Sequence, residues 1–186
     1  MHVETIRCVA DALASATYGV NVLLASRTRD GSDPVPSNVT VYDDTRHGWV
    51  SRMQYVPDAL PSGVTLPALL VTLNTDSIEF DVNPKPTNGA KCVRSAEVPV
   101  AIHYLARGST SASEMIDALY TLAAVRDCLT ILASPAGKSA RQRNVVRLDR
   151  LTALEELKVM TPIDDVIVAG AVTCTWTAHE LAAVLT

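Results

Sequence analysis

The stretch Glu97–Leu132, EVPVAIHYLARGSTSASEMIDALYTLAAVRDCLTIL, joins an alternating pattern to a helical one. In its first part, apolar residues recur at every second position, which places them on one face of an extended chain. Ala101 and Leu105 make the other face apolar as well, so we expect a central strand that is covered on both sides. The residues of the first face are Val98, Val100, Ile102 and Tyr104.

The second part of this stretch predicts a helix that begins near Ser111. Ser111 and Glu114 have the spacing of a capping box, in which the serine oxygen accepts a backbone N–H and the glutamate reaches back. Gly108 lets the chain turn out of the preceding strand. The apolar residues that we expect on one helical face are Ala112, Met115, Ile116, Leu119, Tyr120, Leu122 and Ala123.

Two enzymatic interpretations of the turn GSTSA fail at a required residue. A phosphate-binding loop needs a lysine directly after its second glycine, and no lysine lies near Gly108. A hydrolase nucleophile elbow needs G-x-S-x-G, and GSTSA lacks the second glycine. The start of a helix is therefore the favoured interpretation.

Outward from this centre, three further segments define the order of elements. Apolar spacing from Val3 to Ala16 predicts an N-terminal amphipathic helix, with Gly19 as its left-handed cap. VNVLLAS, directly after Gly19, is interpreted as a short strand, and LPALLVTLN (Leu66 to Asn74) as a strand led by Pro67. Long loops are expected at 27–63 and 83–91, and loops of this length can become ordered when the chain binds a partner. The first loop contains the short apolar pieces VTVY and WVSRMQYV.

The C-terminal third predicts a hairpin of two long strands. DVIVAGAVTCTWT alternates between two sets of residues over a length typical of a long strand. VVRLDRLTALEELKVM, before it, is ambiguous, because its leucines step by three, which suits a helix poorly over that length. The fold class expected for the whole chain is α/β (α+β): a mixed, mostly antiparallel sheet with an N-terminal helix and a central capped helix packed on it, in a single domain, 1–186.

Composition excludes several classes of protein. Hydrophobic residues make up 48% of the chain and charged residues 19%, which is typical of a folded globular protein. The net charge of −4 argues against a general nucleic-acid binder. No run approaches the roughly 20 apolar residues that span a bilayer, and the start does not resemble a signal peptide. The widely spaced cysteines, Cys8, Cys92, Cys128 and Cys174, predict buried reduced thiols.

Few other residues suggest chemistry. None of the histidines, His2, His47, His103 and His179, has a partner at metal-ligand spacing, so no metal, cofactor or catalytic residue is expected. The acidic pairs Asp43-Asp44 and Asp164-Asp165 are interpreted as solvated turns rather than cation sites. A cluster of like charge stands out on this acidic chain as a candidate interface for a negative partner. Its members are Lys138, Arg141, Arg143, Arg147 and Arg150.

The order of these elements resembles that of the tail terminator (tail completion) proteins of long-tailed bacteriophages. The resemblance rests on ETIRCVADALASA, on LPALLVTLN, and on the strand-to-helix stretch followed by DDVIVAGAVTCTWTA. It implies a virion protein of the tail neck, assembled in the host cytoplasm. Such proteins form a ring, typically a hexamer, that ends growth of the tail tube and joins the tail to the head connector. The partners implied are further copies of the chain, the tube protein and the head-closure protein. Genome DNA would pass through the ring without sequence-specific binding, and no membrane is involved.

Two alternatives remain open at this stage. One is a different neck or tail adaptor protein, or a cellular adaptor with no viral role. The other is a small cytosolic hydrolase that uses Ser109 or Ser111 with His103 as its base. The sequence supplies no orienting acid for the second alternative, and the resemblance implies no catalytic site.

Overall fold

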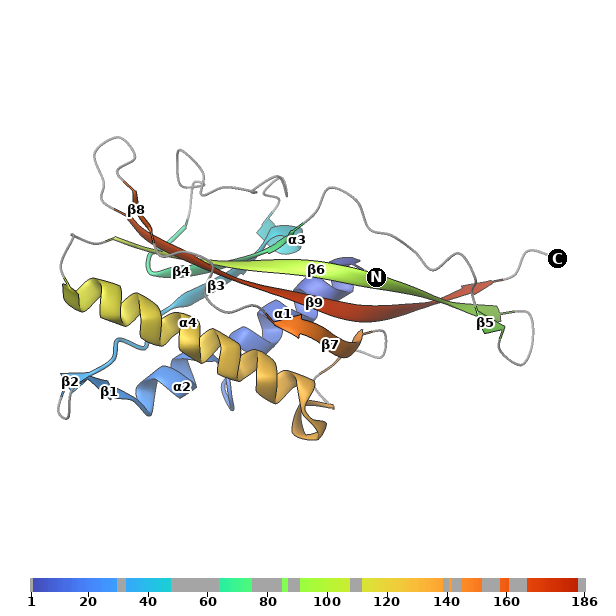
Figure 1. Cartoon of the computed structure of the whole chain (residues 1–186), viewed down its shortest axis with the longest axis horizontal. Helices are drawn as coiled ribbons and strands as arrows, with labels where there is room; N and C mark the ends of the chain where they lie inside the picture. Colours follow the sequence, from blue (N-terminus) through green and yellow to red (C-terminus); the bar gives the residue numbers. More distant parts are fainter. Residues whose placement is uncertain are drawn as a thin grey trace.

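The computed structural model describes residues 2–29, 33–47, 64–74, 85–86, 91–107, 112–138, 141, 145–151, 158–160 and 167–183. The chain has the α+β fold expected from its sequence. Helices α1 (His2–Leu13), α2 (Val20–Ala25) and α4 (Ala112–Ala133) lie on one side of a seven-stranded sheet (Figure 1). The described residues also include two short helical segments, α3 (Asp44–His47) and η1 (Pro135–Gly137).

The sheet is mixed and mostly antiparallel. Its main path runs β3-β4-β6-β9-β7, with β5 paired to β6 and β8 paired to β9. Among the described strands, only β3 and β4 run parallel, and a separate two-stranded sheet pairs β1 (Thr28–Arg29) with β2 (Asp33–Pro34). The strands of the main sheet are β3 (Thr40–Asp43), β4 (Ala68–Leu73), β5 (Lys85–Pro86), β6 (Lys91–Arg107), β7 (Val145–Leu151), β8 (Lys158–Met160) and β9 (Ile167–Ala183).

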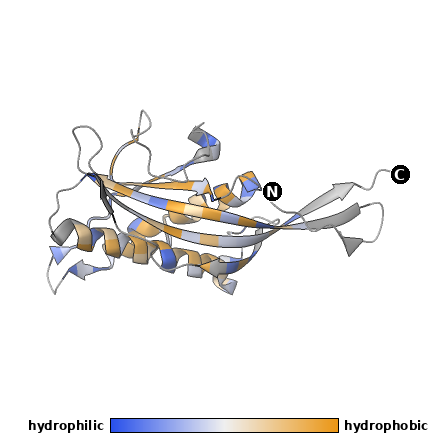
Figure 2. Ribbon diagram, turned by 45° about the horizontal axis from the view of Figure 1, so that its top comes forward, coloured by the Kyte–Doolittle hydropathy of each residue, from blue (hydrophilic) through white to orange (hydrophobic). Residues whose placement is uncertain are grey.

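The central strand predicted from EVPVAIHYLA is confirmed as part of β6, which lies between β4 and β9. Its alternating residues Val98, Val100 and Ile102 are all buried in the core beneath the helices. Ala101 and Leu105, on the opposite face, are buried too. Hydropathy mapped on the ribbon shows apolar residues concentrated where the helices meet the sheet (Figure 2).

The predicted C-terminal hairpin of two long strands is confirmed in part: β9 is a long strand of 17 residues, but its partners before it in the chain are two shorter strands of seven and three residues. The ambiguous segment before it forms strands, β7 and β8, and both pair antiparallel with β9. The register between β7 and β9 shifts twice, which marks bulges between Val145 and Arg147 and between Leu148 and Arg150. A shifted register breaks the strict alternation of a strand at Leu148 and Leu151, and Leu154 and Leu157 lie outside the described residues.

The short strand predicted for VNVLLAS is wrong, because this segment forms α2. Val20 and Leu24, four residues apart, are both buried, as on one face of a helix. Asn21 fixes the helix from its other side: its amide donates to the carbonyl of Val39 and accepts the N–H of Val39, each at 2.9 Å. Such long-range contacts decide the structure of a short apolar run, which periodicity alone leaves open.

Gly19 is not the left-handed cap that the sequence suggested. Its backbone is extended, with φ −67° and ψ 173°, and it precedes α2. The reason for glycine is space: a Cβ at this position would lie 2.3 Å from the carbonyl oxygen of Ser15 and 2.6 Å from that of Leu13. The turn between α1 and α2 is therefore too tight for any side chain.

Helix α4 packs on the sheet as expected, and its predicted face is confirmed in part: Leu122 is buried, and Met115 and Tyr120 are partly buried against the core. Ile116 and Leu119, assigned to the buried face, are 40% and 45% exposed. The helix is apolar on nearly all sides, so its periodicity did not specify the buried face. The residues that the structure buries are Ala118, Thr121, Leu122, Ala124, Val125, Cys128, Leu129 and Leu132. The predicted capping serine, Ser111, lies outside the described residues.

Three further expectations fall wholly or partly outside the described residues. These are a second strand, which the sequence IEFDV (78–82) predicts after LPALLVTLN, the apolar piece WVSRMQYV, and the turn at Gly108. Of NPKPTNGAK, the structure describes Lys85 and Pro86 as β5, and Lys91 as the first residue of β6. The apolar piece VTVY corresponds to β3, which begins at Thr40.

Candidate functional site

The predicted basic cluster does not form one free patch. Arg141 donates from Nη1 to the carbonyls of Leu132 and Ala133, at 3.0 and 2.5 Å. These carbonyls belong to the last turn of α4, where backbone carbonyls have no hydrogen-bond donor within the helix. A cation placed there donates to them and also interacts favourably with the negative end of the helix dipole. Arg141 is therefore a capping residue of α4, and its charge is engaged within the chain.

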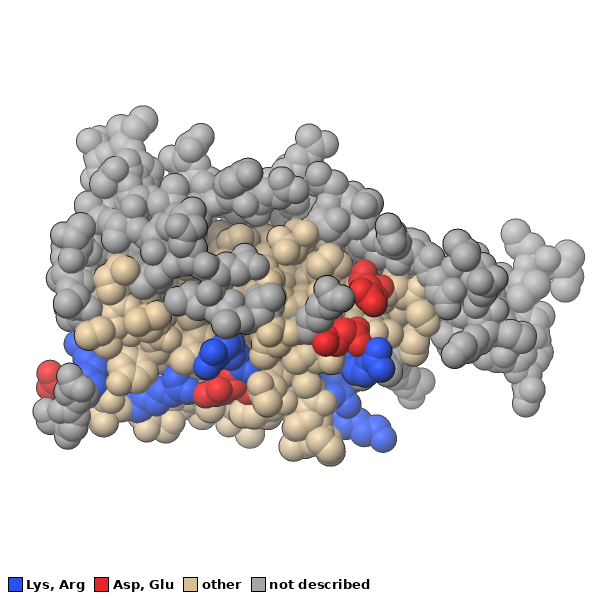
Figure 3. All heavy atoms as spheres, viewed as in Figure 1, with Lys and Arg blue, Asp and Glu red and all other residues tan. Residues whose placement is uncertain are grey.

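The other members of the cluster are dispersed. Lys138 is exposed after η1. Arg147, in β7, has a side chain that is 73% exposed and donates to Asp149 at 2.6 Å. Arg150 belongs to the same strand, and Arg143 lies outside the described residues. Lys138 and Arg147 are thus the members that the structure presents to solvent. Figure 3 shows basic and acidic side chains interspersed with uncharged residues over the lower half of one face of the molecule.

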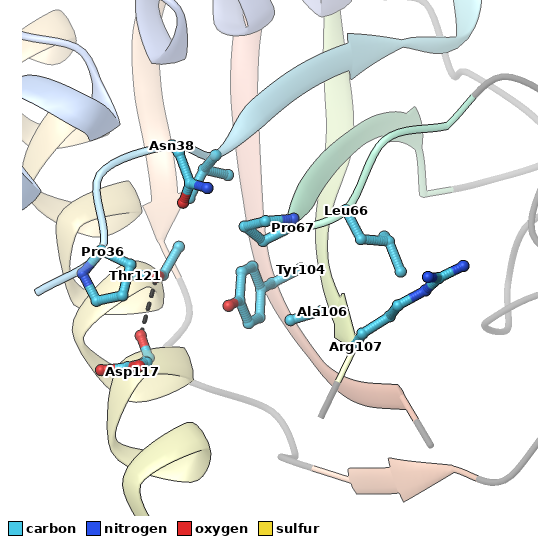
Figure 4. A pocket seen from close by; sticks show the side chains of 10 residues that line it. Pro36, Asn38, Leu66, Pro67, Tyr104, Ala106, Arg107, Asp117 and Thr121 are labelled. Carbon is cyan, nitrogen blue, oxygen red and sulfur yellow. Dashed lines mark hydrogen bonds between the residues drawn. The ribbon is translucent and has the colours of Figure 1, made fainter. Parts of the chain in front are cut away.

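A pocket of about 280 Å³ lies where the first half of α4 faces the ends of β4 and β6 (Figure 4). Two prolines form part of its apolar wall, and the Leu66–Pro67 peptide bond is cis. In the close view, the hydroxyl end of Tyr104 points toward the side of the pocket that holds Asp117 and Thr121, whereas Arg107 points away from it. The lining residues are Pro36, Asn38, Val39, Leu66, Pro67, Tyr104, Ala106, Arg107, Asp117 and Thr121.

Polar groups of this pocket are engaged in internal contacts. Asp117 accepts from both Nε of Arg29, at 2.7 Å, and Nη2 of the same guanidinium. Thr121 donates its hydroxyl to the backbone carbonyl of Asp117 at 2.9 Å. A bidentate pair of this kind fixes geometry strongly. Together with the Arg27–Asp127 ion pair, it ties the segment containing β1 to α4.

The hydrolase alternative gains no support from the described residues. Ser109 and Ser111 lie outside them, and His103 is half-buried in the middle of β6. The structure instead pairs Ser95 with His179, whose Nδ1 lies 2.9 Å from the serine oxygen. These residues are direct neighbours across β6 and β9, a contact that only the strand register could have revealed. A nucleophile and its base need a concave site that holds the substrate. Neither Ser95 nor His179 lines the pocket beside Asp117 or the smaller one beside Leu119.

The acidic pair at Asp43 is not the solvated turn that we expected. Asp43 is buried and accepts from the hydroxyl of Thr45 at 2.6 Å and from the N–H of Arg46 at 2.9 Å. It therefore caps the start of α3, as carboxylates commonly do at helix N-termini. Asp164 and Asp165 lie outside the described residues. Within the described ranges, no three metal-ligating side chains come together.

Buried reduced cysteines are confirmed for Cys8, Cys128 and Cys174, which are free thiols in the core. Burial raises the pKa of Cys174 to about 12, because the thiolate would lose its hydration there. The indole nitrogen of Trp176 lies 3.3 Å from the Cys174 sulfur, and its N–H lowers this pKa, although by less than burial raises it. Burial likewise raises the pKa of Cys128 to about 12. Cys174 is thus an inert core residue at neutral pH.

Alkaline pH should destabilise the chain through Cys174. A group whose pKa is raised on folding contributes stability below its unfolded pKa, near 9.0, and loses that stability as the pH rises toward its folded pKa. From about pH 9 to 10.5, we expect the wild-type free energy of unfolding to fall by roughly 1 to 2 kcal/mol more than that of Cys174→Ala. Urea unfolding at the two pH values tests this. Equal losses in both proteins would show that Cys174 ionises as readily in the folded state.

Comparison of the chain with models of known protein families and with curated protein sequences finds no match. No helix among the described residues has the length and apolar character needed to cross a membrane. The class that the fold defines is therefore an α+β protein with its helices on one face of a mixed sheet.

Proposed function

We propose that this chain is a structural subunit of the neck of a long-tailed bacteriophage. In this role, copies of the chain form a ring of six that caps the head-proximal end of the tail tube. The ring ends tube growth and joins the tail to the head connector, and genome DNA passes through its channel without sequence-specific contacts. The chain has no catalytic role in this proposal, and its place is the virion.

The order and layering of elements are the observation that supports this proposal. An N-terminal helix, α1, is followed by the proline-led β4, by β6 entering α4, and by the long C-terminal β9. The same order underlies the resemblance to tail terminator proteins. A different neck or tail adaptor with this layering is the alternative, and it differs in which partner the ring contacts.

The exposed members of the basic cluster suggest how such a subunit contacts an acidic neighbour. Lys138 and Arg147 are exposed, whereas Arg141 is engaged in capping α4. On a chain of net charge −4, acidic surface is available on the adjacent copy, and exposed positive charge attracts it. We therefore assign the electrostatic part of the partner contact to Lys138 and Arg147, with Arg143 and Arg150 as further members of the cluster.

Electron microscopy of the purified protein tests the ring, and a tube-capping assay tests the role. Wild-type protein added to growing tail tubes should shorten them, and Lys138→Glu combined with Arg147→Glu should weaken this effect. The loss should shrink as salt rises, because exposed charges are screened within about 8 Å at physiological ionic strength. The matched control is the double substitution to glutamine, which should weaken capping less. Tubes that grow to the same length with and without wild-type protein would refute the capping role.

A further inference from the structure

The segment between α2 and β3 contains a small hairpin that is separate from the main sheet. Its strands β1 and β2 pair through Thr28 with Pro34 and through Arg29 with Asp33, and they lie beside α4 (Figure 1). Thr28, Asp33 and Pro34 are exposed, whereas Val35, directly after β2, is packed in the core. A hairpin of this size is at best marginally stable alone, so its position depends on the contacts that hold it.

Two arginine side chains hold the hairpin on α4. Among the described residues, every hydrogen bond and ion pair between 27–29 or 33–34 and α4 comes from Arg27 or Arg29. Arg29 donates to both carboxylate oxygens of Asp117, with 2.7 Å from Nε to the nearer one. Arg27 pairs with Asp127 and donates from Nη1 to the carbonyl of Tyr120 at 3.1 Å. The attachment of these residues is therefore electrostatic.

The Arg29–Asp117 pair is the stronger of the two. Its side chains are 29% and 17% exposed, and the two parallel hydrogen bonds fix its geometry. Asp127, in the other pair, is 52% exposed, so water and salt screen its charge more fully. Release of Arg29 from Asp117 is thus the step that frees the hairpin.

A second carboxylate lies next to Arg29 on the hairpin itself. Asp33 is the direct cross-strand partner of Arg29, and such partners present their side chains to the same face. Within the described ranges, Asp33 forms no hydrogen bond or ion pair. Its charge offers Arg29 an alternative partner and repels Asp117, and both effects weaken the closed position.

The contact of Arg29 also determines the charge of the pocket beside α4. Asp117 lines that pocket, whose other walls include Pro36, Pro67 and the ring of Tyr104 (Figure 4). A carboxylate among apolar and aromatic walls is the chemistry that binds a guanidinium group, because the group pairs with the acid and stacks on flat surfaces. In the closed position, the guanidinium of Arg29 occupies this carboxylate from within the chain.

We propose that the β1–β2 hairpin is an electrostatic latch whose Arg29 masks a binding site for alkylguanidinium groups at Asp117. The hairpin opens locally, with Leu24 and Val35 still buried on either side of it, and opening leaves the Asp117 carboxylate free at the pocket. The latch is a property of the single chain and does not depend on the role proposed above.

Amide hydrogen exchange at constant pH measures the opening. The reporter is the N–H of Val35, which donates to the carbonyl of Arg27 at 3.3 Å and closes the base of the hairpin. We expect Asp117→Asn to accelerate its exchange at least about tenfold, and Asp33→Asn to slow it by about two- to fivefold. The control, Asp11→Asn, breaks an ion pair of α1 with Arg46 and should leave this amide unchanged.

Amides at the centre of β6 report on the rest of the fold and should keep their wild-type exchange in all three variants. Unchanged Val35 exchange in Asp117→Asn would overturn the latch, and so would faster or unchanged exchange in Asp33→Asn. Equal acceleration in the hairpin and in β6 would also overturn it, because the hairpin would then open only together with the whole chain.

Methylguanidinium is the probe for the masked site, with sodium chloride at the same concentration as the control for ionic strength. It should shift the amide resonances of Asp117 and Thr121 in Arg29→Gln, with an affinity at least about tenfold higher than in wild type, because the latch leaves only a fraction of wild-type molecules open. Combining Arg29→Gln with Asp117→Asn should abolish the shift. No shift in Arg29→Gln, or an equal shift in the double variant, would refute the masked site.

Discussion

Replacing Trp176 by alanine is expected to remove a large part of the stability of this protein. Trp176 is fully buried and is the largest side chain in the core. It lies in β9 between Val98 of β6 and Leu148 of β7, so the cavity left behind would adjoin both neighbouring strands. Truncation of a buried tryptophan to alanine costs about 3 to 5 kcal/mol, against a total stability of roughly 5 to 15 kcal/mol for a typical domain.

Urea unfolding followed by circular dichroism measures this effect. Trp176→Phe serves as the matched control, because it keeps an aromatic ring in the core and should cost clearly less than alanine. Trp176→Phe also removes the N–H that lies 3.3 Å from the sulfur of Cys174, so any residual loss includes that contact. An unfolding midpoint for Trp176→Ala equal to that of wild type would place this residue outside the core.

Aspartate at position 129 should be far more damaging than aspartate at position 119 of the same helix. Leu129 is fully buried against the sheet, whereas Leu119 is 45% exposed. A carboxylate at position 129 must be buried without a partner or take up a proton, and the apolar contacts of leucine are lost as well. We expect Leu129→Asp to lower the free energy of unfolding by at least about 4 kcal/mol. Leu119→Asp should change it by less than about 1 kcal/mol.

Both variants should be measured at protein concentrations low enough to keep the chain monomeric, because the ring proposed above would add contacts between copies. A helix rotated as the sequence pattern suggested would give the opposite ranking, with Leu119→Asp the more damaging. Equal effects at the two positions would indicate that α4 does not pack on the sheet through one defined face.

The alternating strands were predictable because burial on a sheet follows a period of two. The residues Val98, Val100 and Ile102 repeat strictly, and one face of β6 accordingly lies in the core. The same argument held for β9. Pro67 was expected at the start of a strand, and β4 begins at the next residue, Ala68. In these segments the sequence pattern and the tertiary environment favour the same structure.

The candidate site was less predictable, because its residues come together only through tertiary contacts. Clustering in sequence suggested a basic patch from Lys138 to Arg150, but Arg141 turns back to the end of α4. The Ser95–His179 contact joins residues far apart in the chain through the strand register. The pairing of Arg29 with Asp117 likewise depends on how the segment containing β1 crosses α4. No local pattern contains this information.

The sequence by itself determined the fold class, the central position of β6, the long strand β9 and the presence of α4, because period and length specify these elements. Tertiary structure alone decided that VNVLLAS is a helix, since the Asn21–Val39 contacts and burial of Leu24 exist only in the folded chain. It also decided which side of α4 is buried. A helix that is apolar all round can be buried on any side, and the sheet selects the face that fills its core. That selection leaves Ile116 and Leu119 at the surface.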